Sequence, residues 1–123
     1  MKAFYTAICL FAIMMCAITF NYFYICSLSQ ELISDLEQLP LPSAENNTAL
    51  QAEHIRNKWN ENRRLVQITV NHTEIEMISN AADELCVFAK YQDTTEFERA
   101  KSILINTLEE LELSEKLSPA NIL

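Results

Sequence analysis

The fold is decided by AFYTAICLFAIMMCAITFNYFYICSLSQ, residues 3–30, a stretch that contains no charged side chain. Lys2 and the amino terminus supply the positive charge before it. A helix needs about 20 mainly apolar residues to cross a bilayer, and this stretch exceeds that length. We therefore predict a transmembrane anchor over residues 1–26 that continues into a juxtamembrane helix over residues 27–39.

A cleaved secretory signal is the competing interpretation of this beginning. Ser27 and Ser29 follow the apolar run and have the small side chains that a signal peptidase accepts. The apolar region of such a signal usually spans about 7–15 residues, whereas here apolar character persists to Ile25. The length favours an anchor that is retained.

The charges on the two sides of the anchor predict its orientation. Lys2 precedes the span, Glu31 and Asp35 follow it, and the next Lys or Arg is Arg56. The positive-inside rule then places the amino terminus in the cytoplasm and the rest of the chain outside the cell membrane. The net charge of −8 makes nucleic acid a poor partner.

One stripe of the span carries small or weakly polar side chains. Its members recur at spacings of three and four: Cys9, Ala12, Cys16, Thr19, Phe23 and Cys26. Such residues let a second helix approach closely in lipid, where packing drives association. The stripe predicts helix pairing in the bilayer, and the alternative is that these residues are simply tolerated there.

The composition excludes several classes of protein and favours helices. The chain has no glycine, so it cannot build the phosphate-binding loops of nucleotide-binding proteins. Only Cys86 of the four cysteines lies outside the predicted span, so no disulfide within the chain can staple the domain. The part outside the membrane must be stabilised by packing or by a partner.

For the remaining chain we predict a linker over residues 40–47 and a helical bundle over residues 48–123. We expect Thr48 to cap the first helix of the bundle with Gln51 in a capping box, Asn71 or Thr73 to cap the second, and Asp93 or Thr94 to open the third. Pro119 is expected to end the last helix.

Apolar residues at helical spacing define the faces of these helices. The expected core residues are Ala52, Ile55, Trp59, Val66 and Thr69 or Val70, then Ile75, Ile78, Ala82, Leu85 and Ala89, flanked by Phe88, then Phe97, Ala100, Leu104, Leu108 and Leu111. A leucine stripe of Leu28, Leu32, Leu36 and Leu39 continues outward from the anchor, and we expect it to pack on the bundle or on a second copy. The fold class is therefore all-α, with an N-terminal transmembrane helix continuing into an antiparallel bundle of three to four helices.

Candidate chemistry is sparse. His72, Glu76 and Asp83 have spacings that place them on one side of a helix, and such groups can bind a divalent metal. The same spacings are common on solvated helix faces, and no HExxH signature is present. We therefore assign no catalytic, metal-binding or cofactor-binding residue, and we expect the protein not to be an enzyme.

A basic cluster surrounds Trp59 and consists of Arg56, Lys58, Arg63 and Arg64. One interpretation is that it docks an anionic partner, a lipid headgroup or the acidic patch of another subunit. The favoured interpretation pairs Glu53 with Arg56 and Glu61 with Arg64 on the same helix and buries Trp59 in the core.

Several short motifs resemble a known family. They are Trp59 with Asn62 and Arg63, then His72 and Glu74 with Ile75, and the ending Asn121-Ile122-Leu123. This pattern resembles a domain-of-unknown-function family of small single-pass helical proteins from clostridia-like bacteria. The resemblance covers the whole chain and implies an extracytoplasmic bacterial domain; it supplies no catalytic residues.

These patterns together predict an interaction or accessory protein, without enzymatic activity, in the membrane. Its expected partners are the lipid bilayer and either a second copy of the chain or a larger membrane protein. The alternatives are an extracytoplasmic regulator that senses a ligand or metal, and a cleaved, secreted helical protein.

Overall fold

The structure is a computed structural model that describes the backbone of residues 1–68 and 70–122 and, within these, the side chains up to residue 114. The described backbone forms four helices and no strand: α1 Lys2–Glu37, α2 Thr48–Val66, α3 His72–Lys90 and α4 Thr94–Ile122. The predicted fold class, an all-α protein with a long apolar first helix, is confirmed.

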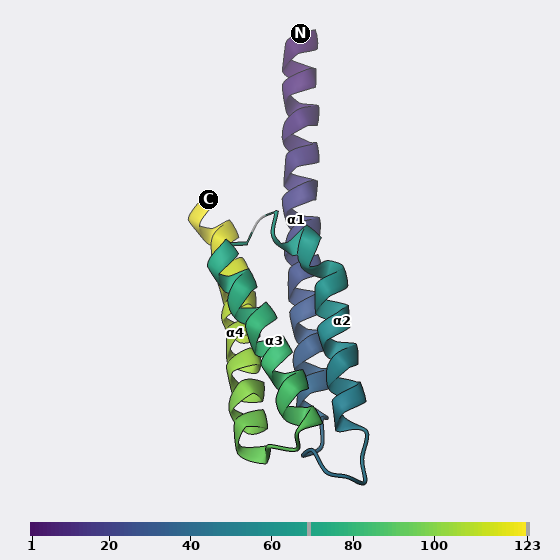
Figure 1. Cartoon of the computed structure of the whole chain (residues 1–123). Coiled ribbons are helices and arrows are strands. Elements are labelled where there is room, and N and C mark those ends of the chain that lie inside the picture. The colour runs from purple at the N-terminus through teal and green to yellow at the C-terminus, as the bar shows by residue number, and fades with distance from the viewer. Residues whose placement is uncertain (69, 123) are drawn as a thin grey trace.

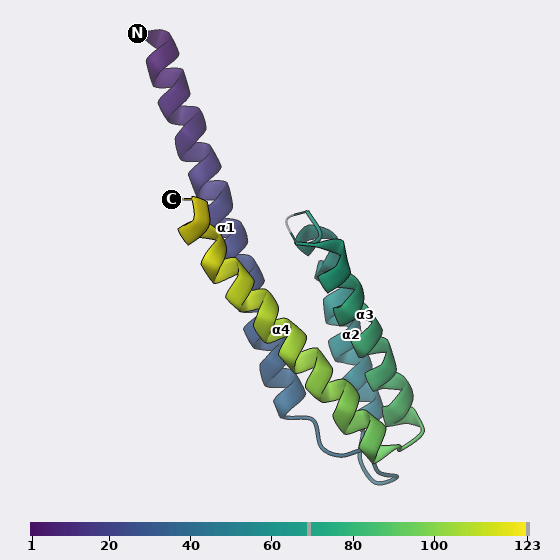
Figure 2. The same cartoon turned by 90° about the vertical axis from the view of Figure 1, so that its left-hand side faces the viewer.

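The helices form an antiparallel bundle from which α1 projects. Figure 1 shows α1 running down, α2 up, α3 down and α4 up, with the amino-terminal half of α1 extending alone beyond the rest. α1 packs against α2 and α4, and α3 packs against the same two helices. Figure 2 shows α1 beside α4 on one side and α2 beside α3 on the other.

α1 changes its surroundings partway along its length. Large apolar side chains such as Phe4, Leu10 and Phe20 are exposed, and the buried positions of the helix begin at Ile25. From there the predicted leucine stripe enters the core: Leu28, Leu32, Leu36 and Leu39 are all buried in one cluster with the other three helices. Of the two arrangements expected for this stripe, packing on the chain's own bundle is the one found.

The core agrees with the apolar spacing of the sequence. All predicted core residues on α2, α3 and α4 are buried, and Phe88, expected to flank them, is partly buried against the cluster. Residue 69 lies outside the described part, and its alternative Val70 is buried. Trp59 is 1% exposed, and its indole N–H donates to the Ser79 hydroxyl at 2.9 Å, so the polar atom of this large core residue is satisfied.

The helix starts agree with the sequence at two places and differ at one. Asn71 Oδ1 accepts from the Thr73 amide at 3.0 Å, and Asp93 Oδ1 accepts from the Glu96 amide at 3.2 Å. The predicted cap at Thr48 is wrong, because Asn47 is the N-cap residue and makes no side-chain cap bond. The Thr48 hydroxyl instead bonds to the Pro40 carbonyl and to Asn46 Oδ1, which ties α2 to the linker.

Two other features follow from the lack of glycine and the placement of proline. Gln92 takes the left-handed conformation (φ 58°) that glycine usually supplies after a helix, and the Asp93 amide then bonds back to the Phe88 carbonyl at 3.0 Å. The prediction that Pro119 ends the last helix is wrong, because α4 continues to Ile122. A proline so near the end removes only one backbone hydrogen bond, and little of the helix remains after it.

Candidate functional site

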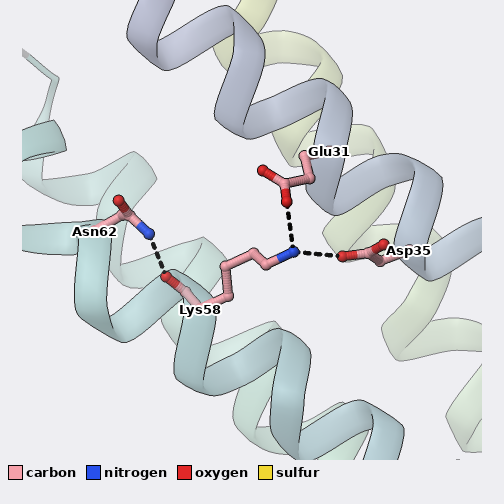
Figure 3. A network of polar contacts seen from close by, with 4 residues as sticks. All are labelled: Glu31, Asp35, Lys58 and Asn62. Atoms are coloured by element: carbon pink, nitrogen blue, oxygen red, sulfur yellow. Dashed lines mark hydrogen bonds and ion pairs between the residues drawn. The ribbon is translucent and has the colours of Figure 1, made fainter.

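A polar network joins α1 to α2 along the side of the bundle. Glu31 and Asp35 lie one helical turn apart on α1, and Lys58 reaches across from α2. Lys58 Nζ is 2.8 Å from Glu31 Oε1 and 2.9 Å from Asp35 Oδ2 (Figure 3). The hydrogen bond to Glu31, followed by the one to Asp35, raises the pKa of Lys58, so the side chain stays charged at physiological pH.

A second contact extends the network toward the projecting half of α1. The Tyr24 hydroxyl donates to Asn62 Oδ1, and the Asn62 amide donates to the Lys58 carbonyl at 2.7 Å. On α2, Asn62 lies one turn after Lys58. On α1, Tyr24 lies nearly two turns before Glu31. The two contacts fix how the antiparallel helices are aligned.

Pockets lie on both sides of the Lys58 bridge. One, of about 320 Å³, is lined by Asp35, Leu39, His54 and Lys58 among others. The other, of about 340 Å³, includes Phe20, Tyr24, Glu31 and Asn62 in its lining. Both lie between α1 and α2, which pack less closely than α1 and α4 do. We call the line of contact between α1 and α2, which Lys58 bridges, the seam. It is the most polar line of contact that α1 makes with the bundle.

The residues considered for metal binding do not form a site. His72 Nε2 is 2.9 Å from Glu76 Oε1, and their side chains are 80% and 62% exposed. Asp83 is exposed and does not join them, and no group of three or more His, Cys, Asp or Glu among the described residues is arranged to hold a metal ion. His54 lies in the pocket beside Lys58 instead.

The basic cluster behaves differently from the favoured interpretation. Trp59 is buried as expected, but neither Glu53 with Arg56 nor Glu61 with Arg64 forms an ion pair within the described residues. Lys58, whose partners are on α1, is the only cation of the cluster with an ion pair in this part of the chain. The packing of α1 on α2 brings two carboxylates beside Lys58, a residue for which no local partner was predicted.

The cysteines occupy two kinds of surroundings. Cys9 and Cys16 are exposed on the projecting half of α1, whereas Cys26 is buried, so the stripe of small residues passes from an exposed surface into the bundle. Cys86 is buried on α3, and burial raises the pKa of its thiol to about 11, which leaves it protonated and unreactive at neutral pH. Helix pairing along the exposed part of the stripe stays a prediction.

Sequence reasoning missed the seam. Glu31 and Asp35 have the i, i+4 spacing of two groups that can share a partner, and Asn62 and Lys58 have the same spacing on α2. These spacings are the signal that could have indicated a polar contact. They do not reveal which helices face each other.

The comparisons with known proteins identify a family. A family model described as Domain of unknown function (DUF4363) matches residues 19–122, from within α1 to the last residue of α4. No curated protein and no solved structure matches the chain. Since the match covers most of the chain, including the inner part of α1 together with the other three helices, the protein belongs to the family of the Domain of unknown function (DUF4363).

Proposed function

We propose that this protein is a non-enzymatic, membrane-anchored binding module that presents its helical bundle at the outer surface of the cell membrane. The observation that supports the proposal most strongly is the continuity of α1. The helix is long and apolar enough to cross a membrane. The apolar stretch that gives it this property is exposed, and its last turns belong to the core of the bundle.

This continuity has a mechanical consequence. A bundle on a flexible linker can rotate freely relative to its anchor, whereas an unbroken helix transmits orientation from the membrane to the bundle. α1 is helical from Lys2 to Glu37 without interruption. A partner that binds the span would therefore also be held in a fixed position relative to the bundle, which suits an accessory subunit.

The partner that we propose is a larger membrane protein or a second copy of this chain. The exposed surface of α1 includes Cys9, Ala12 and Cys16, whose small side chains allow another helix to approach closely. Lys2 before the span, and the lack of any further Lys or Arg before Arg56, favour an extracytoplasmic bundle.

The anchor is tested by expressing the full chain with a reporter at its carboxyl terminus. We expect the protein to remain in the membrane pellet after carbonate extraction, and the reporter to be active only if it is of a type that works outside the cytoplasm. Recovery of a soluble product that begins near Ser27 would show a cleaved signal and overturn the proposal.

The partner is tested with a photo-crosslinking amino acid in native membranes. We expect adducts from Ala12, on the stripe of small residues, and fewer from Ile13, which is exposed on a neighbouring part of the helix surface. Equal labelling at both positions, or lipid adducts alone, would contradict binding through the stripe.

A further inference from the structure

The end of the bundle from which α1 projects carries a surface that is both basic and apolar. Arg63 and Arg64 lie in the last turn of α2 and are exposed. Leu65 is 55% exposed and Ile68, just after the helix, is 74% exposed. We call these four residues, Arg63, Arg64, Leu65 and Ile68, the α2 tip.

The contacts of α2 with α1 show how far the tip extends along the anchor. The Tyr24–Asn62 hydrogen bond places these two residues side by side, and Phe20 lines the same pocket as Asn62. A helix rises about 1.5 Å per residue, so the four residues that follow Asn62 on α2 cover about 6 Å. The four residues from Tyr24 back to Phe20 on α1 cover the same distance. Because the two helices are antiparallel, both steps lead toward the projecting end of α1. Figure 1 shows the end of α2 and the beginning of α3 at this end of the bundle.

The height of the tip matters because Phe20 belongs to the exposed apolar part of α1. Phe20 is 74% exposed and Phe23 is 63% exposed, and such rings are typical of the boundary between lipid and water. When the apolar part of α1 is in a bilayer, the α2 tip is at the level of the lipid headgroups.

The charge of the tip is opposite to that of the chain as a whole. The chain has a net charge of −8, yet residues 62–71 contain two arginines and no acidic residue. Within the described residues neither Arg63 nor Arg64 has an ion-pair partner. Guanidinium groups bind phosphate oxygens through paired hydrogen bonds, so anionic headgroups are the ligands that suit them.

We propose that the α2 tip docks on the surface of a bilayer that contains anionic lipids, with Arg63 and Arg64 on lipid phosphates and Leu65 and Ile68 inserted among the headgroups. This inference rests on the proposed function, because it requires α1 to be in the same bilayer. The bundle then contacts the membrane at two places, through α1 and through the tip. This second contact fixes the tilt of the bundle relative to the membrane surface.

Tryptophan reporters in the full-length protein test this docking. Ile68→Trp reports on the tip, just after the end of α2. Leu50→Trp is its matched control, because Leu50 is 55% exposed and lies at the opposite end of α2. Phe20→Trp reports on the anchor. Each variant is reconstituted in vesicles of phosphatidylcholine with phosphatidylglycerol, with and without brominated acyl chains, and the emission of native Trp59 is subtracted by means of the unaltered protein.

We expect Ile68→Trp to emit at shorter wavelength and to be quenched in brominated vesicles, and Leu50→Trp to emit as in water and not to be quenched. If Phe20→Trp is quenched while Ile68→Trp has the emission and quenching of Leu50→Trp, the docking proposal is overturned. The proposal that α1 is a membrane anchor is then still supported, and the tip is available to a protein partner. If Phe20→Trp is not quenched, α1 is not in the bilayer and the proposed function itself is wrong.

A second set of variants tests the role of the arginines. In the Ile68→Trp protein, Arg63→Gln with Arg64→Gln should reduce quenching in anionic vesicles to its level in pure phosphatidylcholine. Lys90→Gln with Lys101→Gln removes the same charge from α3 and α4 away from the tip and should leave quenching unchanged. Equal quenching in both double variants would overturn the assignment of the arginines to lipid phosphates.

Discussion

The outer half of α1, residues 2–24, and its inner half, residues 25–37, share one unbroken helix but differ in what surrounds their side chains. The outer half exposes large apolar residues such as Phe4, Leu10 and Phe11. The inner half buries Leu32 and Leu36 completely or nearly so, and its charged side chains remain exposed or partly exposed.

The difference shows that one unbroken helix can carry two different patterns of apolar side chains. In the outer half apolar residues occur around the whole circumference, which suits lipid on every side. In the inner half they form one stripe, and Glu31 and Asp35, the partners of Lys58, lie beside that stripe where α1 faces α2. The same residue type, leucine, is therefore exposed in the outer half, as at Leu10, and buried against the other helices in the inner half, as at Leu36.

The largest expected effect comes from removing the same side chain in each half. Leu36 is 0% exposed and Leu10 is 63% exposed. Leu36→Ala leaves a cavity in the core and should lower the free energy of unfolding by about 2–5 kcal/mol. Leu10→Ala should leave it unchanged, because Leu10 contacts no part of the core.

Both variants are measured on the full chain in mild detergent, with the near-ultraviolet circular dichroism of Trp59 as the signal of tertiary structure during denaturation. Similar losses of stability in the two variants would mean that the halves of α1 do not differ as described. A loss only in Leu10→Ala would reverse the comparison.

A smaller effect is expected from the bridge that holds the inner half to α2. The side chains of Lys58, Glu31 and Asp35 are 33%, 58% and 38% exposed, so solvent screens the pairs. Lys58→Met should therefore cost only about 1 kcal/mol or less, while keeping the length of the side chain. It should also speed hydrogen exchange of backbone amides in residues 25–37, because α1 and α2 then lose their main polar contact.

Arg99→Met is the control for this measurement. Arg99 also pairs with two carboxylates, Glu84 on α3 and Glu96 on α4, but it makes no ion pair with α1. Faster exchange in the inner half of α1 in both variants, or in neither, would show that Lys58 does not specifically secure that half.

The parts of the structure that sequence predicted are those that depend on one helix at a time. The leucine stripe of α1 and the apolar spacing on α2, α3 and α4 each follow from the period of a single helix, and all of them face the core. The cap at Asp93 is local as well. Such features need no knowledge of how the helices are placed relative to one another.

The parts that sequence did not predict depend on the alignment of two helices. Lys58 has acidic residues on its own helix, yet its partners are Glu31 and Asp35 because the packing of α1 on α2 brings them within 3 Å. The contact between Tyr24 and Asn62 joins residues that are 38 positions apart. The rotation and offset of each helix come from core packing as a whole, which short spacings in the sequence do not specify.

At neutral pH the smallest effect is that of the ionisation of Cys86, which is absent there. Burial raises the pKa of this thiol from its ordinary value of 9.0 to about 11. Between these values the unfolded chain has lost the thiol proton while the folded chain keeps it, so unfolding releases a proton and rising pH favours the unfolded state. The stability that depends on Cys86 is complete below pH 9 and decreases as the pH rises from 9 to 11.

The measurement compares the pH dependence of the melting temperature in three proteins. Cys86→Ala should show a shallower decline between pH 9 and 11 than the unaltered chain, whatever its melting temperature at neutral pH. Cys9→Ala should keep the original decline, because Cys9 is exposed on the outer half of α1 and is outside the core. If Cys86→Ala declines as steeply as the unaltered chain, the thiol is accessible to water and the core around it is less tightly closed than the burial of Cys86 on α3 implies.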